Sequence, residues 1–490
     1  MGIKAAVVGS GIGGLASALR LAAKGYQVEV FEKAAVAGGK INEIRMNGFR
    51  FDTGPSLLTF PSLIHELFAL FQEDPKDFIQ FMKLEISCKY FWEDRTMVEA
   101  WQDPSLFAHE IKQTTGVDAR KVISYLQECE KLYQIAGDAF IFNSLHKPSN
   151  YFTASFLKTL LQVPALDPLR TLHQRNKAWF GHPKVVQIFD RYATYNGSSP
   201  YHTPATLRMI AHLEHNGGAF FPFQGMYSIV QALVNFAKSK GVKFHFHSEV
   251  EKILTSAAGV KGVRVNGTEL PFDVVVSDID VVSLYNNLLD GYPLPAIQAS
   301  QQRSSSALIF YWGIGKSFPN LNLHNVLFSS DYRKEFRHLF ETHTIADDPT
   351  VYIFISSKMI PGDAPEGAEN WYVMINAPEN NGQYTTETIQ YARSRIIEKI
   401  QRTLGIDISP LILCETFADP KSIEADTGSY KGSLYGLSSN GIWAAFNRHP
   451  NFSHKVNNLY FVGGSVHPGG GIPLCLASVK IVANELPLIS

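Results

Sequence analysis

The sequence lacks any run of about 18 consecutive apolar residues, so no segment is long enough to cross a membrane as a helix. It also lacks the succession of basic, apolar and small residues that marks a secretory leader, because a short apolar strand is already expected at residues 4–8. These absences predict a cytoplasmic protein that contacts a membrane only from its surface.

Cysteine is scarce and net charge is almost absent. The four cysteines stand far apart with no C-x-x-C pair, which is typical of reduced, buried thiols and not of a disulfide framework. The formal net charge is -1, and no long basic block or nucleic-acid motif occurs. A neutral chain exerts no overall attraction on a polyanion, so we exclude nucleic acid as a partner.

Apolar and aromatic side chains are abundant. Hydrophobic residues make up 45% of the chain and charged residues 18%, with 33 Phe and 20 Tyr. A length of 490 residues exceeds the size at which a single core usually stops growing. We therefore expect two domains, or one domain with large insertions.

The N-terminal segment carries a phosphate-binding pattern. A short apolar run, Ala5 to Val8, leads into Gly9, Gly11 and Gly14 in the spacing G-x-G-x-x-G, and apolar residues then recur at helical spacing up to Gly25. Such glycines allow a tight turn, close backbone approach to a pyrophosphate and close packing of helix on strand. The pattern predicts a Rossmann-like unit with the phosphate on the helix N-terminus. The alternative is a tight turn with no ligand.

Glu32 ends the second strand of this unit, which we expect at residues 27–31. A carboxylate there accepts hydrogen bonds from ribose hydroxyls and disfavours a 2′-phosphate, which argues against NADP. The chain continues with Gly38-Gly39-Lys40 and an alternating hairpin at residues 44–51, turned by Asn47-Gly48. An NAD-binding domain would normally proceed instead to another helix and parallel strand.

Five landmarks in chain order resemble the flavin-dependent amine-oxidase-like superfamily and, within it, the bacterial carotenoid desaturases of phytoene type. They are GSGIGGLASALRLAAKGYQVEVFEK, GGK followed by FDTGPS, GGAFFPFQGMYSIVQALVNFAKSKGVKFHFHSEVEKI, VVVSDID, and NLYFVGGSVHPGGGIPLCLASVKIV. The resemblance covers essentially the full length. It implies an α/β fold with a Rossmann-like FAD-binding domain, a discontinuous substrate-binding domain of mixed sheet and helices, and a helical membrane-contacting region.

The resemblance also implies that the chain returns to its first domain at its end. The expected division is an FAD-binding domain at 1–75, 211–290 and 431–490, a helical membrane-contacting and substrate-entry region at 76–210, and a substrate-binding domain at 291–430. The strand at 459–462 would rejoin the first sheet, and the helix after it would direct its N-terminus at the FAD.

By the same resemblance, residues from all three segments hold the FAD. The glycines before Ile472 remove side chains beside the isoalloxazine ring, and Pro473 suits a first helical turn. Many relatives carry an Asp in the GGS stretch to bind ribitol, where this chain has Gly464-Ser465. The expected FAD-binding set is Gly9, Gly11, Ile12, Gly13, Gly14, Glu32, Lys33, Gly38, Gly39, Lys40, Pro55, Ser56, Val250, Gly464, Ser465, Gly471, Ile472 and Pro473.

In the central segment, residues 242–246 alternate between apolar and polar side chains, which is typical of a strand with one buried face. Residues 249–254 are expected to continue that strand. In relatives, the backbone near Val250 meets the adenine. His245 and His247 are spaced so that they could bind a metal, but no third ligand is evident, so we expect no metal and place them on the wet side of the strand.

The last insertion contains apolar and aromatic runs that predict strands at residues 306–312, 351–356 and 371–377. Such strands suit a sheet that covers an apolar channel for a carotenoid. The alternative is that these side chains are ordinary core.

Residues 151–184 mix five basic residues, Lys158 among them, with Leu, Phe and Trp and hold a single acid, Asp167. This is the composition of an interfacial membrane patch. The alternative is a solvated helical hairpin. Because the substrate implied by the resemblance dissolves in lipid, we favour the membrane patch.

No Ser-His-Asp, paired-carboxylate or Cys-His pattern emerges, so hydrolysis has no support. The stretch 190–200 is polar beside apolar segments, and the corresponding region of relatives approaches the substrate. Arg191 and Tyr195 are therefore candidate catalytic residues; the alternative is that Asp190 and Arg191 belong to a structural ion-pair network. His467 is a third candidate, because its motif places it near the flavin; it could equally serve only to shape its loop.

The resemblance implies that a hydride passes from the substrate to FAD and that the neighbouring carbon loses a proton. The motifs GGSVHPGGGIP and RYATYNGSSPY are similar to those of 1-hydroxycarotenoid 3,4-desaturases. The expected substrate is therefore a hydroxylated carotenoid end, and 1'-hydroxy-γ-carotene is one example. The alternatives are a phytoene-type multi-step desaturase and a non-redox prenyl-lipid-binding protein of GDP-dissociation-inhibitor type. The expected electron acceptor is oxygen or a quinone.

Overall fold

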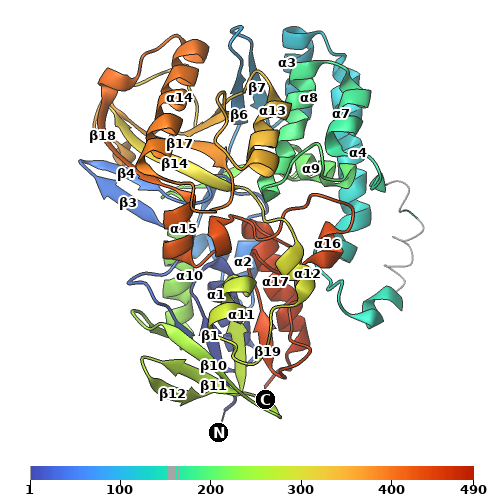
Figure 1. Ribbon diagram of the computed structural model, residues 1–490, viewed down its shortest axis with the longest axis vertical. Coiled ribbons are helices and arrows are strands. Elements are labelled where there is room, and N and C mark those ends of the chain that lie inside the picture. Colours follow the sequence, from blue (N-terminus) through green and yellow to red (C-terminus); the bar gives the residue numbers. More distant parts are fainter. Residues whose placement is uncertain (1, 153–161, 163–165, 490) are drawn as a thin grey trace.

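The computed structural model describes residues 2–152, 162 and 166–489, and the lower half of Figure 1 is built on a parallel five-stranded sheet. In spatial order its strands are β19 (Leu459–Phe461), β13 (Val274–Ser277), β1 (Lys4–Val8), β2 (Gln27–Phe31) and β9 (Lys243–His245). Every neighbouring pair is parallel. The two ends of the chain therefore fold into one sheet, as the resemblance implied.

Helices cover this sheet because each has an apolar stripe to bury. α1 (Ile12–Ala23) is buried along most of its length and packs against α10 (Tyr227–Ser239) and α17 (Ile472–Glu485). α2 (Ser62–Ala69) packs on α1 and α17, and α11 (Val281–Asn287) follows β13. α1 thus contacts both the middle and the last segment of the chain.

A separate antiparallel sheet of β10 (Val250–Ser256), β11 (Gly259–Val265) and β12 (Thr268–Pro271) follows β9. The prediction that residues 249–254 continue the strand before them is therefore wrong. His247 has a φ of 52°, in the left-handed region, which ends an extended strand. The chain turns there, and β10 pairs in a different sheet.

The upper half of Figure 1 holds a mixed seven-stranded sheet. Its strands, in spatial order, are β18 (Ile412–Ala418), β14 (Ser306–Ile314), β17 (Glu369–Ala377), β16 (Val351–Phe354), β15 (His324–Leu327), β6 (Ile86–Phe91) and β7 (Met97–Trp101). Neighbours are antiparallel except β15 and β6, which are parallel. The three strands expected in the last insertion are confirmed as β14, β16 and β17.

β6 and β7 correct the prediction that residues 76–210 form a helical region. They pair as an antiparallel hairpin and complete one edge of the seven-stranded sheet. The chain reverses between them at Arg95, whose φ is 67°. Two runs rich in aromatic and β-branched residues around a short polar turn are a hairpin pattern, so the sequence did hold this information.

The rest of this region is helical and stands beside β7 on the right of Figure 1. Its helices are α3 (Pro104–Thr115), α4 (Ala119–Phe140), α7 (Leu172–Phe180), α8 (Pro183–Asp190) and α9 (Met209–His215). Residues 153–161 and 163–165, with Lys158 of the expected membrane patch, lie outside the described residues. Within the part of the chain that is described, no helix combines the length and apolar character that a membrane crossing needs.

The Asn47-Gly48 turn behaves as its sequence predicts. β3 (Glu43–Met46) and β4 (Phe49–Asp52) form the expected hairpin, with φ values of 50° at Asn47 and 83° at Gly48. The short strands β5 (Phe81–Lys83) and β8 (Phe220–Pro222) pair antiparallel. The further helices are α12 (Ala296–Ser300), α13 (Tyr332–Arg337), α14 (Thr386–Leu404), α15 (Pro420–Thr427) and α16 (Ala444–Asn447).

Candidate functional site

One cavity of about 1110 Å³ extends from the glycine turn of the first sheet to the inner face of the second. Its lining comes from the N-terminal segment, from the loops after β9 and β13, from the seven-stranded sheet, and from the segment that leads into α17. One long ligand, or two ligands in contact, would therefore touch both sheets.

The turn between β1 and α1 is shaped for a phosphate group. Gly9 has a φ of 91°, a conformation that glycine adopts readily. A Cβ on Gly14 would lie 2.1 Å from the Gly9 carbonyl oxygen, so this glycine allows α1 to pack closely on the turn. Gly9 and Gly11 line the cavity, whereas Gly13 and Gly14 do not and serve packing instead.

Glu32, at the end of β2, is 9% exposed and organises the glycine turn. Its carboxylate accepts hydrogen bonds from the Ser10 N–H at 2.9 Å, the Ser10 hydroxyl at 2.6 Å and the Ala34 N–H at 2.9 Å. A carboxylate has about four acceptor sites, so room remains for a ribose hydroxyl. Val250 and Lys33 line the same end of the cavity, and the Lys33 ammonium donates to a carbonyl oxygen of α15 at 2.9 Å.

Asp278 is a charged residue of this end that our expected set does not contain. A Cβ on Gly13 or on Gly463 would lie 2.4 Å from its Oδ1 atom, so both glycines make room for its carboxyl group. Burial raises the pKa of Asp278 to about 7, although a backbone hydrogen bond with Gly14 and the charge of Lys40 act in the opposite direction. The available signal was its position directly after a buried strand, in VVVSDID.

The two glycine-rich segments at opposite ends of the chain lie in contact. A Cβ on Gly13 would be 3.3 Å from the Gly463 Cα atom. The Ser465 hydroxyl accepts the first N–H of α11 at 2.9 Å. The chain then passes through Gly471, with a φ of 102°, into α17, whose first turn contains Pro473. Because Gly471 and Pro473 line the cavity, the N-terminus of α17 borders it.

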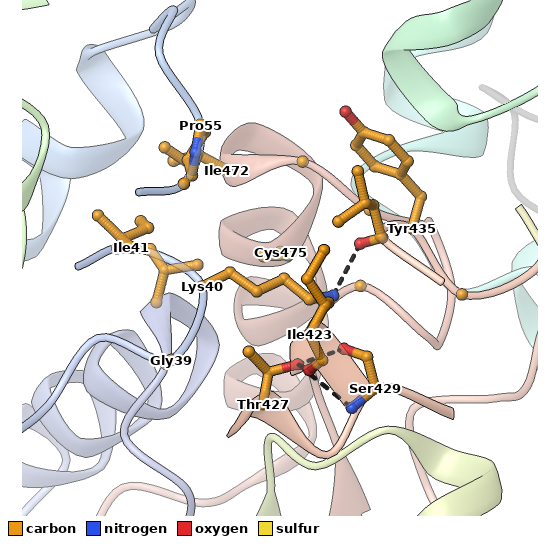
Figure 2. A pocket seen from close by; sticks show the side chains of 18 of the residues that line it. Gly39, Lys40, Ile41, Pro55, Ile423, Thr427, Ser429, Tyr435, Ile472 and Cys475 are labelled. Atoms are coloured by element: carbon orange, nitrogen blue, oxygen red, sulfur yellow. Dashed lines mark hydrogen bonds between the residues drawn. The ribbon is translucent and has the colours of Figure 1, made fainter. Parts of the chain in front are cut away.

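Lys40 extends its side chain across the cavity lining (Figure 2). Its ammonium donates to the Leu434 carbonyl oxygen at 2.8 Å. Burial lowers its pKa, and the nearby charges of Asp280 and Asp278 oppose that effect. Lys40 therefore brings a hydrogen-bond donor into the cavity lining, close to the segment that carries Tyr435.

The inner face of the seven-stranded sheet forms the opposite wall. Side chains alternate along a strand, so one face of β15, β16 and β17 points into the cavity. α9 contributes further apolar lining. The lining residues from these four elements are His324, Val326, Tyr352, Tyr372, Met374, Asn376, Met209, Ile210 and Leu213. This wall is mostly apolar and aromatic, which favours the interpretation of these strands as the roof of a channel.

Arg191 and Tyr195 line this wall and belong to a buried ion-pair network. The Arg191 guanidinium donates to the Tyr90 hydroxyl at 2.7 Å and to the Tyr195 hydroxyl at 3.2 Å, and lies 3.4 Å from the Glu214 carboxylate. The Tyr195 hydroxyl also donates to Glu214. Burial raises the pKa of Glu214, but the charge of Arg191 and the other contacts of the carboxylate, the hydrogen bonds from Tyr195 and Ser87 among them, together outweigh it, so the net shift is downward. The acid partner of Arg191 is thus Glu214 and not Asp190.

His467 does not line the cavity, whereas Ser465 and Pro468 beside it do, and its expected place near the flavin stays a prediction. The side chain is 1% exposed, and its Nε2 atom hydrogen-bonds to the Asn143 carbonyl oxygen at 2.9 Å. Burial lowers its pKa to about 3. The loop directs this imidazole toward the segment after α4, which agrees with the alternative that it shapes the loop.

The two histidines of the central segment form no metal site. His245 lies 2.7 Å from the Glu29 carboxylate and stacks on Phe31. Within residues 2–152 and 166–489, no three His, Cys, Asp or Glu side chains are grouped so that they could hold a metal ion.

The residues present fit a flavin dinucleotide. The glycine turn leaves its backbone open to a pyrophosphate, Glu32 offers an acceptor to a ribose, and two helix N-termini border the cavity. Every residue of the expected FAD-binding set lines this one cavity except Gly13 and Gly14. The cavity continues past Ser56 to the apolar wall, so a substrate can lie against the flavin end.

Comparison with known proteins agrees with this geometry. Residues 12–487 match the family described as flavin containing amine oxidoreductase. A 1-hydroxycarotenoid 3,4-desaturase of Flavobacterium sp. (strain P99-3) is 48% identical over 484 residues, which cover 99% of each chain. A 4,4'-diapolycopene oxygenase of Methylomonas sp. is 30% identical over 493 residues, 98% of this chain and 97% of that protein. Cyclohexylamine oxidase from Brevibacterium oxydans IH-35A has the same fold, with a TM-score of 0.61 at 14% identity over 99% of both chains.

Proposed function

Because the chain belongs to the family of flavin-containing amine oxidoreductases and is an oxidoreductase with FAD as its cofactor, we propose that it desaturates a carotenoid. The proposed reaction is 3,4-desaturation of a 1-hydroxycarotenoid end, such as that of 1'-hydroxy-γ-carotene. The observation that carries this proposal is the 48% identity, over 99% of both chains, with an enzyme of that name. The relative named for an oxygenase is 30% identical over a similar length.

The shape and chemistry of the cavity support a carotenoid as substrate. Its wall on the seven-stranded sheet is apolar and aromatic, and α9 faces it with Met209, Ile210 and Leu213. Carotenoids are long, apolar and conjugated, so they gain most from a wall that buries hydrocarbon and offers aromatic faces. The same wall excludes water from the bonds that react.

The reaction removes two electrons and two protons from adjacent carbons. Bound FAD supplies the acceptor for a hydride from one carbon. The neighbouring carbon loses a proton to water or a base, and the electron pair of its C–H bond forms the new C=C bond. In this proposal the glycine turn and Glu32 bind the nucleotide, and Lys40 and the residues around Pro55 and Pro473 border the flavin.

Arg191 and Tyr195 act in this proposal on the substrate side of the cavity. Their network with Glu214 holds a fixed charge pair and a hydroxyl at the wall that the substrate contacts. Groups held this firmly can orient a substrate without reorganising during the reaction. We assign them this positioning role, and we assign none to His467.

We further propose that the protein lies on a membrane surface to collect its substrate. Phe152 is 81% exposed and Leu169 84% exposed, and both lie within the segment expected to form the membrane patch. Arg175 and Lys184 of the same stretch are paired with the acids Glu128 and Asp94, which suits the solvated-hairpin alternative for α7 and α8. The exposed apolar side chains therefore support this proposal better than the basic ones do.

The decisive experiment is anaerobic mixing of the FAD-loaded protein with a 1-hydroxycarotenoid and with the same carotenoid without its hydroxyl. We expect the hydroxylated substrate to bleach the flavin absorbance and to shift the polyene band to longer wavelength. Phytoene is the third arm, because its turnover would favour the multi-step alternative. If no carotenoid bleaches the flavin, the proposed function is wrong.

Two further measurements complete the test. Readmission of oxygen, or addition of a quinone to the bleached enzyme, identifies the electron acceptor by the rate at which the flavin colour returns. Mass analysis of the product separates a desaturase, whose product loses two hydrogens, from an oxygenase, whose product gains oxygen. A preparation that neither contains flavin nor binds added FAD would favour the non-redox lipid-binding alternative.

A further inference from the structure

One ring nitrogen stands out on the apolar wall of the cavity. His324 is 3% exposed and lines the cavity from β15. Its Nδ1 atom hydrogen-bonds with the Tyr352 hydroxyl at 2.8 Å, and its ring stacks on those of Tyr352 and Phe354. Its Nε2 atom is buried and has no hydrogen-bond partner among the described residues. Burying such a group without a partner costs about 1–3 kcal/mol, so the site is complete only with a ligand.

The contacts of His324 fix the direction in which this free nitrogen points. The Tyr352 hydroxyl lies between the imidazole and the Ser56 hydroxyl, to which it is bonded at 2.6 Å. With Nδ1 bonded to the Tyr352 hydroxyl and the rings of Tyr352 and Phe354 lying nearly parallel to it, the imidazole is held in one orientation. The chain of bonds from Ser56 also links His324 to the segment expected to contact the flavin.

The charged groups around His324 balance one another, so they leave no net charge to bind an ionised ligand. Arg191 is balanced by Glu214, which lies 3.4 Å from it. Burial lowers the pKa of His324 to about 3, so its imidazole is neutral at physiological pH. An ionised ligand would find no opposite charge here, whereas a neutral ligand with one polar group would be satisfied.

The bonding pattern favours a hydroxyl group over other neutral polar groups. If Tyr352 donates to Ser56, then Nδ1–H donates to Tyr352 and Nε2 is an acceptor. If the chain of bonds runs the other way, Nε2–H is a donor. A hydroxyl satisfies either arrangement, because it both donates and accepts, whereas a ketone only accepts.

We propose that His324 is the specificity residue for the substrate's terminal hydroxyl group, which its Nε2 atom binds on an otherwise apolar wall. This inference rests on the proposed function, which supplies a long apolar substrate with one hydroxyl at the end that reacts. His324 touches no bond that breaks. It positions the chain end so that the C–H bonds of C3 and C4, beyond the hydroxylated C1, face the flavin.

The test compares His324→Asn with His324→Gln in the FAD-loaded enzyme. The Asn amide reaches the position of Nδ1, so it keeps the bond to Tyr352 and leaves the Nε2 position empty. The Gln amide reaches the Nε2 position and can still bind a hydroxyl. The readout is kcat/KM for a 1-hydroxycarotenoid divided by kcat/KM for the same carotenoid without the hydroxyl.

We expect His324→Asn to lower this ratio about 10- to 100-fold and His324→Gln to lower it much less. The loss should fall mainly on KM for the hydroxylated substrate, because the hydroxyl does not react and is bound equally well before and during the reaction. Tyr352→Phe, which removes the bond that holds the imidazole in place, should lower the ratio to an intermediate value. Flavin content, read from absorbance, reports that each variant is folded and loaded.

The outcomes separate the inference from the proposed function. Wild-type enzyme that turns over no hydroxylated carotenoid contradicts the proposed function. Wild-type enzyme that is active but indifferent to the hydroxyl overturns the role of His324. An unchanged ratio in both His324→Asn and Tyr352→Phe, with normal flavin content, overturns it as well. If His324→Asn fails to retain flavin, the same ratio is compared among wild type, His324→Gln and Tyr352→Phe. An unchanged ratio in Tyr352→Phe then overturns the role of His324.

Discussion

At the scale of single residues, Asp278 is the buried acid on which we expect FAD affinity to depend. Its pKa is raised to about 7, and its carboxyl group lies against Gly13, in the turn expected to receive the pyrophosphate. Above this pKa the carboxylate repels a phosphate, and below it the neutral carboxyl does not. FAD affinity should therefore fall about tenfold per pH unit above about pH 7. Titration of apoprotein with FAD, followed by quenching of flavin fluorescence, measures this dependence.

Asp278→Asn is the control, because an amide keeps the shape of the carboxyl group but does not ionise. Its FAD affinity should be flat across the same pH range and should exceed that of the wild type at alkaline pH. The raised pKa also predicts that the unfolding free energy of the apoprotein falls as pH rises from about 4 to about 7, because the folded state binds the proton more tightly than the unfolded state does. Equal pH slopes of FAD affinity in wild type and variant would contradict this role.

Glu32 should contribute to FAD binding in two ways. It faces the cavity where a ribose is expected, and it holds Ser10 of the glycine turn through both the N–H and the hydroxyl. Hydrogen bonds to a charged group contribute about 1.5–3 kcal/mol, so Glu32→Ala should weaken FAD binding about 10- to 100-fold. Equilibrium dialysis against FAD measures the loss.

Ser10→Ala separates the two contributions of Glu32, since it removes only the hydroxyl that the carboxylate accepts at 2.6 Å. A loss of FAD affinity in Ser10→Ala as large as in Glu32→Ala would assign the whole effect to the turn. FAD affinity unchanged in Glu32→Ala would contradict any contact of this carboxylate with the cofactor.

Residue-level prediction from sequence was possible where a local motif fixes the backbone. Gly9, Gly11 and Glu32 are recognisable because turn, helix and strand follow one another within a single βα unit. Asp278 and His324 were missed, because each acquires its surroundings from segments far away in the chain. A lone His in an apolar strand gives no local signal of an unpaired nitrogen, and only the packing of β15 against β16 shows it.

At the scale of elements, α16 lies where the cavity meets the surface. Ala445 lines the cavity, whereas Phe446 of the same short helix is 37% exposed and Trp443, directly before it, is 64% exposed. Phe446 contacts Phe140, at the end of α4, which also lines the cavity. An exposed aromatic pair beside an apolar opening suits insertion into a lipid surface.

We therefore expect the double variant Trp443→Ser/Phe446→Ser to bind lipid vesicles at least about tenfold more weakly than the wild type. Full burial of one large apolar side chain contributes about 1.5–3 kcal/mol, so even partial insertion of two rings gives this loss. Co-sedimentation with vesicles measures the binding. The control is Leu413→Ser on β18, which is 62% exposed on another element and should not change vesicle binding. Equal sedimentation of the double variant and wild type would contradict a membrane role for α16.

Elements were predictable where their period was clear within one short run. β14, β16 and β17 were expected because apolar and aromatic runs of strand length stand between turns. The hairpin of β6 and β7 was not predicted, because the resemblance implied helices for its whole region and the two strands are only 6 and 5 residues long. The break between β9 and β10 depends on a left-handed residue, His247, which a pattern of alternating side chains does not reveal.

At the scale of the whole molecule, one sheet is assembled from three distant stretches of chain. β19 reaches β1 only through β13, and the turn after β1 contacts Gly463 after β19. Closing loops of this length costs chain entropy that grows slowly with loop length, so the contacts must be strong at the point of closure. The resemblance could imply this return of the chain, whereas local patterns alone could not, because no short segment records its distant partner.

FAD should therefore stabilise the protein as a unit. A ligand that binds only the folded state adds about 2.7 kcal/mol to the unfolding free energy at a concentration of 100 times its Kd. Because the cavity is lined by both sheets, we expect the whole molecule to unfold in one cooperative transition, and we expect FAD to raise the Tm of that transition. Calorimetry of apoprotein and FAD-loaded protein tests this. Two transitions, of which FAD shifts only one, would contradict it.

Gly13→Ala tests whether the contact between the two chain ends carries this linkage. Its Cβ would lie 2.4 Å from the Asp278 carboxylate and 3.3 Å from the Gly463 Cα atom, so one of these groups must move. At an open helical position, Ala would instead stabilise a helix by up to about 1 kcal/mol relative to Gly. The sign of the change in stability thus distinguishes a crowded position from an open one.

For Gly13→Ala we expect a lower Tm and a smaller increase in Tm on adding FAD. The control is Gly362→Ala, whose Cβ would meet no atom of the described residues within 4 Å and which should keep both quantities at their wild-type values. A Gly13→Ala variant with a raised Tm and the full FAD response would mean that the two ends are held together elsewhere.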